Sequence, residues 1–296
     1  MVFSESSYFG ELNHRSLNPS LAMAVYFNNQ FLQDEEAMLH VSDLSIQRGY
    51  GVFDFLRAVK DVPLFMADHL ERFKASAAGM HLPLDKSLDE LGKIIKELLR
   101  ISLFPETGVR LMLTGGYSSN SYSFSTPNLV ITCFPIKAAT ATDFERGLKI
   151  ITYEHQRELP HIKSINYLMA VWLQPLIAEK QVDDVLYYKN NIITECPRSN
   201  LFIVTKDNKL VTPAHNILKG ITRSKVLQLA TSIMEVEERD IQLKELLDAA
   251  EVFLTSTTKK ILPVLSVDGS AIGNALPGPV TKNLYERFIE REREFV

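Results

Sequence analysis

Short apolar runs, some continuous and some alternating with polar residues, predict β-strands in both halves of the chain. In the first half they cover 24–27, 30–32, 52–59, 109–114 and 129–134, and in the second half 149–153, 184–188, 192–195, 200–204, 209–211, 251–255 and 261–265. Turn residues such as Asn28-Asn29 and Asp207-Asn208 separate neighbouring runs. The strands between 184 and 211 therefore predict an antiparallel meander.

Apolar residues three and four apart predict helices between these strands. Asp68 is the expected N-cap of one helix, and residues 87–90 form a capping-box pattern ahead of a second. Thr222 is the expected cap of a third. One long apolar helix is predicted after Tyr167, and a closing helix over 280–293.

Antiparallel strands with segregated helices predict an α+β protein rather than a doubly wound parallel sheet. The 296 residues are enough for two domains. The small, polar stretch 137–142 predicts a linker between a smaller N-terminal α/β domain, 1–136, and a larger C-terminal domain with a barrel-like sheet, 143–296. Residues 1–22 have no clear period and are expected to be an N-terminal extension.

Composition and charge exclude several classes of protein. The chain is 46% hydrophobic and 23% charged, as globular proteins are, and its net charge of −4 gives no basic surface for nucleic acid. No apolar run approaches the ~18 residues of a membrane-spanning helix, and the first residues show no signal-peptide core. Cys133 and Cys196 cannot form a disulfide framework, so a reducing cytoplasm is expected. The seven histidines show no metal-ligand spacing.

Lys163 is the first candidate for chemistry. It follows the predicted strand 149–153 and lies at an element boundary between the apolar residues Ile162 and Ile165. A lysine that is desolvated loses its charge more easily and can act as an amine nucleophile. For this window alone, the alternative is an exposed lysine at the start of a helix.

Four other features offer groups for an anion or a ring nitrogen. Glu195 ends a predicted strand, and Arg72 offers a guanidinium for a bidentate phosphate contact. Gly220-Ile221-Thr222 opens a predicted helix, where free N–H groups and the helix dipole attract anions. Hydroxyl residues follow a strand at Ser256, Thr257 and Thr258. Each feature has an ordinary alternative: an exposed strand residue, a surface arginine, a capped helix and a polar loop.

The chain has no GxGxxG fingerprint, no P-loop and no GxSxG elbow. What remains is a lysine, a carboxylate and two hydroxyl-rich anion sites. This inventory suits pyridoxal 5'-phosphate, which needs a lysine for a Schiff base, an acidic partner for its ring nitrogen and a cradle for its phosphate.

The order of these pieces resembles the class IV, or fold-type IV, pyridoxal-phosphate aminotransferases. That family includes branched-chain aminotransferases, D-amino-acid aminotransferases and aminodeoxychorismate lyases. The matching pieces are residues 48–54, 69–72, 162–167, 195–202, 218–223 and 251–257, with Pro263-Val264. They cover the chain from Ala24 to about Val267. The resemblance implies the two-domain D-amino-acid-aminotransferase-like fold.

The resemblance also implies roles. Lys163 is expected to form the Schiff base with the cofactor and to carry the proton, Glu195 to pair with the ring nitrogen, and Tyr167 to bind the phenolic oxygen. The implied phosphate ligands are Arg72, Gly220, Ile221, Thr222 and either Ser256 or Thr257, and the implied substrate contacts are Phe53, Arg110 and Thr258. The implied reaction is ping-pong transamination between an amino acid and a keto acid, usually 2-oxoglutarate.

The resemblance favours a branched-chain-type L-amino acid as substrate. Tyr167 and Arg110 resemble residues of branched-chain enzymes, whereas the Arg-x-His carboxylate trap of D-amino-acid enzymes is replaced by Asn120 and Tyr122. Gly108 departs from the tyrosine of many branched-chain enzymes, and Cys196 from the glycine or alanine that often follows the motif glutamate. D-amino-acid aminotransferase and 4-amino-4-deoxychorismate lyase stay open, and a non-catalytic binding protein is disfavoured because Lys163 and Glu195 are both present.

Members of the family are usually homodimers. We therefore expect a homodimer in which residues 117–125 reach the active site of the neighbouring subunit.

Overall fold

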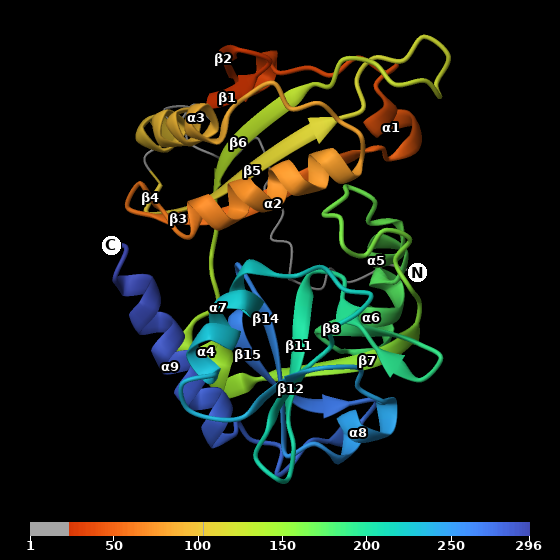
Figure 1. Ribbon diagram of the computed structural model, residues 1–296, viewed down its shortest axis with the longest axis vertical. Helices are drawn as coiled ribbons and strands as arrows, with labels where there is room; N and C mark the ends of the chain where they lie inside the picture. Colours follow the sequence, from red (N-terminus) through yellow and green to blue (C-terminus); the bar gives the residue numbers. More distant parts are fainter. Residues whose placement is uncertain (1–23, 103) are drawn as a thin grey trace, which may run out of the picture.

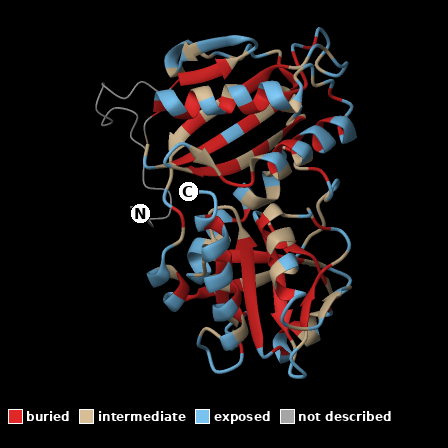
Figure 2. Ribbon diagram, turned by 60° about the vertical axis from the view of Figure 1, so that its left-hand side comes forward, coloured by how far each residue is buried: buried red, intermediate tan, exposed pale blue. Residues whose placement is uncertain are grey.

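The computed structural model describes residues 24–102 and 104–296, and the expected extension 1–22 lies outside the described residues. Two sheets, one in each half of the chain, lie one above the other (Figure 1). Each sheet has its own buried apolar core, and the strands are the most continuously buried parts of the chain (Figure 2). The mixed strands and helices confirm the predicted α+β class.

The N-terminal sheet is antiparallel, with the order β2-β1-β6-β5-β3-β4. Its strands are β1 (Ala24–Phe27), β2 (Gln30–Gln33), β3 (Gly51–Val59), β4 (Val62–Pro63), β5 (Glu106–Thr114) and β6 (Leu129–Pro135). The helical segments are η1 (Asp34–Glu36), α1 (Leu44–Arg48), α2 (Met66–Gly79) and α3 (Leu88–Ser102). Helices α2 and α3 cover one face, where Leu56, Phe73 and Ile95 are buried together, because these strands and helices each have one apolar side.

The C-terminal sheet mixes parallel and antiparallel pairs in the order β13-β12-β11-β14-β15-β7-β8-β9. The strands are β7 (Leu148–Glu154), β8 (Asp184–Lys189), β9 (Ile192–Ile193), β10 (Glu195–Cys196), β11 (Ser199–Val204), β12 (Leu210–Thr212), β13 (Val236–Glu238), β14 (Glu251–Ser256), β15 (Lys260–Val267) and β16 (Ser270–Ala271). The helices are α4 (Ala141–Arg146), α5 (Leu168–Trp172), α6 (Gln174–Lys180), α7 (Ile221–Ala230), α8 (Leu243–Asp248) and α9 (Pro279–Arg293).

Strand β10 shows that this sheet is curled. It pairs with β11 and also lies against β8, although four steps separate β8 from β11 along the sheet. A flat sheet could not bring these strands together. The predicted barrel-like sheet is therefore confirmed.

Several predicted details are wrong. The strands from 184 to 211 do not form one meander, because β8 and β9 lie at one end of the sheet whereas β11 and β12 lie beyond β14. The apolar segment after Tyr167 is split into α5 and α6, with Pro175 in the first turn of α6, where its missing N–H is tolerated. The caps differ too: Phe65 precedes α2 and Gly220 precedes α7, so Asp68 and Thr222 lie inside their helices.

The predicted capping box at Ser87 is confirmed, because its hydroxyl accepts from the N–H of Glu90, whose carboxylate accepts from the N–H of Ser87. Helix α4 begins inside the stretch expected as a linker. The division of the chain into two domains stays a prediction.

One buried ion pair, between Arg57 and Glu292, and several aromatic rings join the two halves. Arg57 of β3 pairs with Glu106 of β5 at 2.5 Å and with Glu292 of α9. Phe65, just before α2, packs on Phe288 and Phe295 at the C-terminal end of the chain. The final helix therefore fixes the position of the N-terminal sheet.

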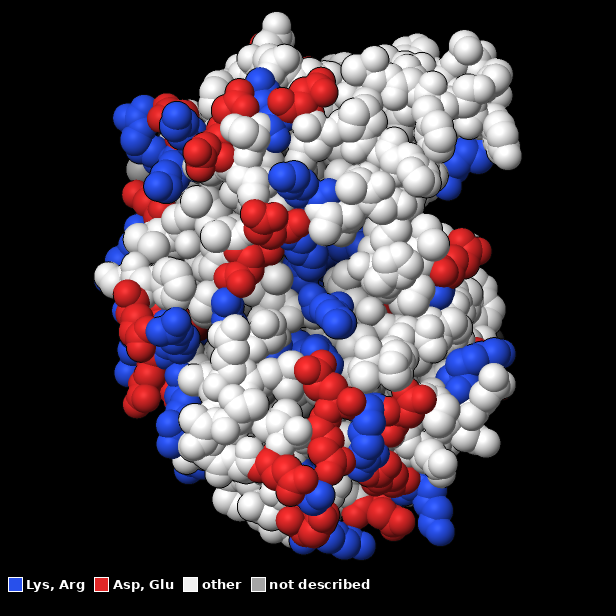
Figure 3. Space-filling view, viewed as in Figure 1, with Lys and Arg blue, Asp and Glu red and all other residues white. Residues whose placement is uncertain are grey.

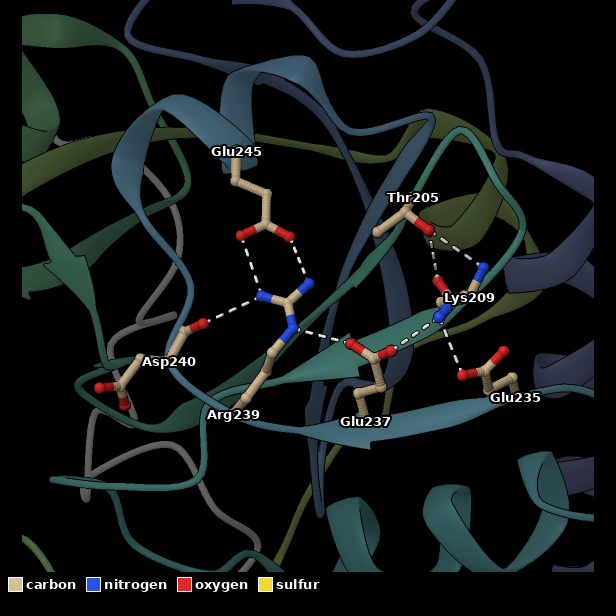
Figure 4. A network of polar contacts seen from close by, with 7 residues as sticks. All are labelled: Thr205, Lys209, Glu235, Glu237, Arg239, Asp240 and Glu245. Carbon is tan, nitrogen blue, oxygen red and sulfur yellow. Dashed lines mark hydrogen bonds and ion pairs between the residues drawn. The ribbon is translucent and has the colours of Figure 1, made fainter.

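A partly exposed network of ion pairs holds β13 beside β12 at the far edge of the C-terminal sheet (Figure 4). Lys209 contacts Glu235 and Glu237, and Arg239 contacts Glu237 and Glu245. Exposed pairs of this kind contribute little individually and more as a network. Each of these carboxylates has a cationic partner, which is consistent with a structural role.

Candidate active site

The segment that carries Lys163 pairs with the N-terminal sheet. The N–H of Phe53 donates to the carbonyl of Lys163 at 2.9 Å, and the N–H of Ile165 donates to the carbonyl of Gly51 at 3.0 Å. Strand β4 pairs only with the far end of β3, so the beginning of β3 has an open edge for this segment. A Cβ on Gly51 would lie 2.9 Å from the carbonyl oxygen of Leu113, so only glycine fits this close approach.

The Lys163 side chain lies between charged groups of both halves. Its Nζ is 4.6 Å from the centre of the Phe53 ring, and the residue is half-buried rather than exposed at a helix start. Burial, assisted by the positive charges of Arg72 and Arg157, lowers the pKa of Lys163 to about 7, against the opposing carboxylates of Asp54 and Glu195. A substantial fraction of the amine is therefore neutral near pH 7, which makes it a usable nucleophile and base.

On the N-terminal side, Asp54, His69 and Arg72 form a compact cluster. The Asp54 carboxylate accepts from Nε and Nη2 of Arg72, both at 2.8 Å, and lies 2.7 Å from Nδ1 of His69. Burial would raise the pKa of Asp54, but Arg72 and His69 hold it well below its usual range. Arg72, expected at the phosphate, is thus oriented by Asp54, and its Nη1 is the group not engaged by that carboxylate.

On the C-terminal side, Glu195 of β10 is only 4% exposed. Its Oε1 accepts from Nη1 of Arg157 at 2.8 Å, and its Oε2 accepts from the N–H of Leu218 at 2.9 Å. Burial raises the pKa of Glu195, and Arg157 opposes that shift. The result is a fixed, buried carboxylate near Lys163.

Helix α7 begins where the sequence predicted an anion site. The N–H of Gly220 donates to Oδ1 of Asn200 at 3.1 Å, and Nδ2 of Asn200 donates to the carbonyl of Leu218. A Cβ on Gly220 would lie 2.1 Å from Oδ1 of Asn200, so the turn requires glycine. Ile221 and Thr222 then form the first turn, whose N–H groups have no carbonyl partner within the helix.

Two of the predicted phosphate residues lie together, because Thr222 and Thr257 line one cavity of about 10 Å³ with His69. The Ser256 hydroxyl accepts from the N–H of Lys259 at 3.1 Å, which leaves its own O–H able to donate. Both Ser256 and Thr257 therefore stay candidates for an anion contact.

Two of the expected substrate residues, Phe53 and Arg110, lie on the face of the N-terminal sheet opposite its helices, whereas Thr258 lies in the turn after β14. Tyr167 packs edge-on against Phe53, with ring centres 5.6 Å apart, and burial raises the pKa of its hydroxyl. Arg110 lies 5.2 Å from the centre of the Phe134 ring. The charge of Arg110 interacts electrostatically with the hydroxyl of Tyr167, so the two side chains lie in one region. Basic side chains gather at the middle of one face, where the two halves meet (Figure 3).

Sequence reasoning missed Asp54 and Arg157. A signal existed for Asp54, because it stands between the apolar residues Val52 and Leu56 on the buried side of a strand, where a charge needs a partner. Arg157 lies in a loop without periodicity and gave no signal. Its role depends entirely on the fold.

This donor set fits a cofactor that carries an aldehyde, a ring nitrogen and a phosphate. It combines a partly neutral lysine, a buried carboxylate, a helix N-terminus with an obligatory glycine, and an oriented arginine. Among the described residues no cluster of metal ligands occurs, and no helix there is long and apolar enough to cross a membrane. The fold and the site thus define an enzyme of amine chemistry.

Comparison with known proteins indicates the same class of enzyme. Residues 51–267 match the family described as amino-transferase class IV, and the chain belongs to that family, which depends on pyridoxal phosphate. A D-alanine aminotransferase of Bacillus licheniformis is 34% identical over 88% of this chain and 94% of its own. A protein of Methanocaldococcus jannaschii, provisionally named a branched-chain-amino-acid aminotransferase, is 31% identical over 90% of this chain and 95% of its own.

The fold is confirmed in the same way. The branched-chain amino acid aminotransferase of Escherichia coli has the same architecture, with a TM-score of 0.84, 26% identity, and coverage of 92% of this chain and 95% of its own. Other structures with this fold contain pyridoxal phosphate or pyridoxamine 5'-phosphate.

Proposed function

We propose that this chain is a transaminase that moves an amino group between a branched-chain-type L-amino acid and 2-oxoglutarate, in two half-reactions with pyridoxal 5'-phosphate. One observation carries the proposal: Lys163, with a pKa of about 7, lies between two oriented carboxylates, one from each half of the chain. Family membership supports the aminotransferase class, and the finer substrate assignment is the part under test.

The cofactor, when bound, supplies an electron sink next to the carbon that loses its proton. Lys163 would hold it covalently and then move the proton. Glu195 would pair with the ring nitrogen, and Tyr167 with the phenolic oxygen. The N-terminus of α7 at Gly220, Ile221 and Thr222 would hold the phosphate together with Arg72 and with the hydroxyl of Ser256 or of Thr257, which lines a cavity with Thr222.

The surroundings of Arg110 support a branched-chain substrate. Its guanidinium offers one cation for a carboxylate, and the aromatic rings of Phe53 and Phe134 offer an apolar surface for an aliphatic side chain. Thr258, in the turn after β14, completes the proposed substrate contacts. Asn120, which replaces an arginine of the D-amino-acid trap, accepts from the N–H groups of Tyr122 and Ser123, so its carbonyl serves the loop.

D-amino-acid transamination is the second candidate. The observation in its favour is the 34% identity to a D-alanine aminotransferase over nearly all of the chain. The stereochemistry of the substrate depends on which side of the cofactor its carboxylate lies. A single arginine, Arg110, on the sheet face opposite the helices is compatible with more than one position of that carboxylate.

A substrate panel tests these assignments. The purified holoenzyme is assayed with L-valine, L-leucine, L-isoleucine, D-alanine and D-glutamate, using 2-oxoglutarate or pyruvate as acceptor. Aminodeoxychorismate, with pyruvate release as the signal, tests the lyase alternative. The proposal expects the highest kcat/KM with a branched-chain L-amino acid. A higher value for D-alanine would assign the second candidate, and pyruvate release from aminodeoxychorismate without transamination would assign the lyase.

We also propose that the protein is a homodimer of two-domain subunits in the cytoplasm. Large apolar side chains are exposed on α5, at Leu168, Val171 and Trp172, and in the loop 117–125, at Tyr122 and Phe124. Exposed apolar groups of this size are typical of interfaces. Light scattering of the active enzyme is expected to give twice the mass of the chain, and full activity in a monomer would contradict the shared site.

A further inference from the structure

Arg157 connects the buried carboxylate to the segment that carries Lys163. It lies in the loop between β7 and that segment, and its side chain is 15% exposed. Nη1 donates to Oε1 of Glu195 at 2.8 Å and to the carbonyl of Pro160 at 3.3 Å. Nη2 donates to the carbonyl of Ile162 at 2.8 Å. One guanidinium therefore holds Glu195 and the residue directly before Lys163.

The geometry leaves Glu195 little freedom. Arg157 holds one carboxylate oxygen and the N–H of Leu218 holds the other. A planar guanidinium donates in several fixed directions at once, whereas a lysine ammonium is a single flexible point charge. Only an arginine can reach the carboxylate and two backbone carbonyls from one position.

We propose that Arg157 is a positioning residue for the reaction: it keeps Glu195 in its charged form and fixes the distance between that carboxylate and Lys163. This inference rests on the proposed function, because Glu195 has this task only if a ring nitrogen is its partner. Arg157 itself needs no contact with the substrate.

The proposal predicts how cofactor binding depends on pH. Burial favours the neutral acid form of Glu195, and Arg157 opposes it, so removal of Arg157 moves the titration of Glu195 upward. A carboxylate that has become neutral no longer attracts a protonated ring nitrogen. The other titratable groups around Glu195 are Lys163 on its own segment, Tyr167 before α5, Tyr187 on β8 and the adjacent Cys196. Arg157 also depresses the pKa of Lys163, so the effect of Arg157 on Glu195 must be measured separately from its effect on Lys163.

The experiment compares Arg157→Met and Arg157→Lys with the parent by equilibrium dialysis of pyridoxal 5'-phosphate against the purified protein from pH 6 to 9. Arg100→Met, on the exposed surface of α3, is the matched control. A one-unit rise in the pKa of Glu195 lowers its charged fraction by up to about tenfold, so Arg157→Met is expected to bind more weakly than the parent at the acid end of the pH series and to recover as pH rises. Arg157→Lys keeps the charge, so its affinity is expected to fall without a new pH dependence.

A double variant isolates the carboxylate. In a Glu195→Gln background there is no acid to titrate at this position, so the pH dependence that Arg157→Met adds to cofactor affinity should be smaller than in the parent background and should reflect Lys163 alone. The proposal is overturned if Arg157→Met binds as tightly as the parent, if it weakens binding equally at every pH, or if Arg157→Lys shows the pH dependence expected of Arg157→Met. If Arg157→Met does not fold, the pH dependence of cofactor binding by Arg157→Lys alone tests the proposal. Absence of cofactor binding by the parent would instead overturn the proposed function.

Discussion

Asp54 gives the sharpest prediction about stability. It is fully buried and its carboxylate contacts Nε and Nη2 of Arg72 and Nδ1 of His69. Asp54→Asn keeps the shape but replaces one acceptor oxygen by an NH₂ donor, which would face donors of Arg72. Removing one partner of a buried ion pair costs about 3 to 5 kcal/mol, because the other charge stays buried without compensation. We therefore expect the free energy of unfolding to fall by about 3 kcal/mol.

Urea denaturation followed by circular dichroism measures this change. With a slope of about 2 kcal/mol per molar urea, a loss of 3 kcal/mol moves the midpoint down by about 1.5 M. Asp85→Asn, at an exposed aspartate, is the matched control and is expected to change stability by no more than about 0.5 kcal/mol. If Asp54→Asn unfolds at the same urea concentration as this control, the cluster does not stabilise the fold and our reasoning is wrong.

The pH dependence gives a second measurement of the same cluster. The folded-state pKa of Asp54 lies below its ordinary value, so its contribution to stability is fully present above that ordinary value, near pH 4. The contribution is lost as pH falls further towards the folded-state pKa. Asp54→Asn cannot titrate, so the stability difference between parent and variant should be constant above about pH 5 and shrink below pH 4. A difference that grows on acidification would contradict the assignment.

Three further predictions concern single residues. Lys163→Ala should bind cofactor that borohydride cannot fix to the protein and should lose transaminase activity. In the parent, the rate of cofactor capture should rise through about pH 7, because the neutral amine is roughly a thousand times more abundant there than for a lysine with a pKa of 10.5. Gly220→Ala should weaken cofactor binding by at least about tenfold in dialysis, since its Cβ would overlap Oδ1 of Asn200 and displace the turn; cofactor binding equal to the parent's would refute this. Arg57→Met should lower the unfolding free energy by about 3 to 5 kcal/mol in urea, since it leaves Glu106 and Glu292 without their partner, and an unchanged midpoint would show that this contact between the halves is dispensable.

Some of the site was accessible from local sequence signals. Glycine and hydroxyl residues at 220–222 predicted a helix N-terminus, and the structure has one there, although the cap is Gly220 instead of Thr222. Lys163 lies within the connection between β7 and α5, five residues before the helix, rather than at an element boundary. The assignment of these residues to one site, however, came from resemblance to a family, because spacing along the chain says nothing about distances between a lysine at 163 and a glutamate at 195.

Local sequence patterns gave wrong predictions where the position of an element depends on the elements it packs against. The meander prediction was wrong because hairpin signals fix which neighbours turn back on each other, but not where each hairpin joins the sheet. The helix after Tyr167 was predicted as one element because apolar spacing continues through the break between α5 and α6.

The sequence by itself determined the fold class, most strand and helix positions and the types of chemical group available, because these follow from periodicity, capping and composition over short stretches. Only the tertiary structure decided the electrostatics of the site. The pKa of Lys163 depends on burial and on charges contributed by both halves, and Arg157 and Asp54 acquire their roles through contacts 38 and 18 residues away along the chain. Burial and charge separation are properties of three-dimensional packing, so no local pattern could have revealed them.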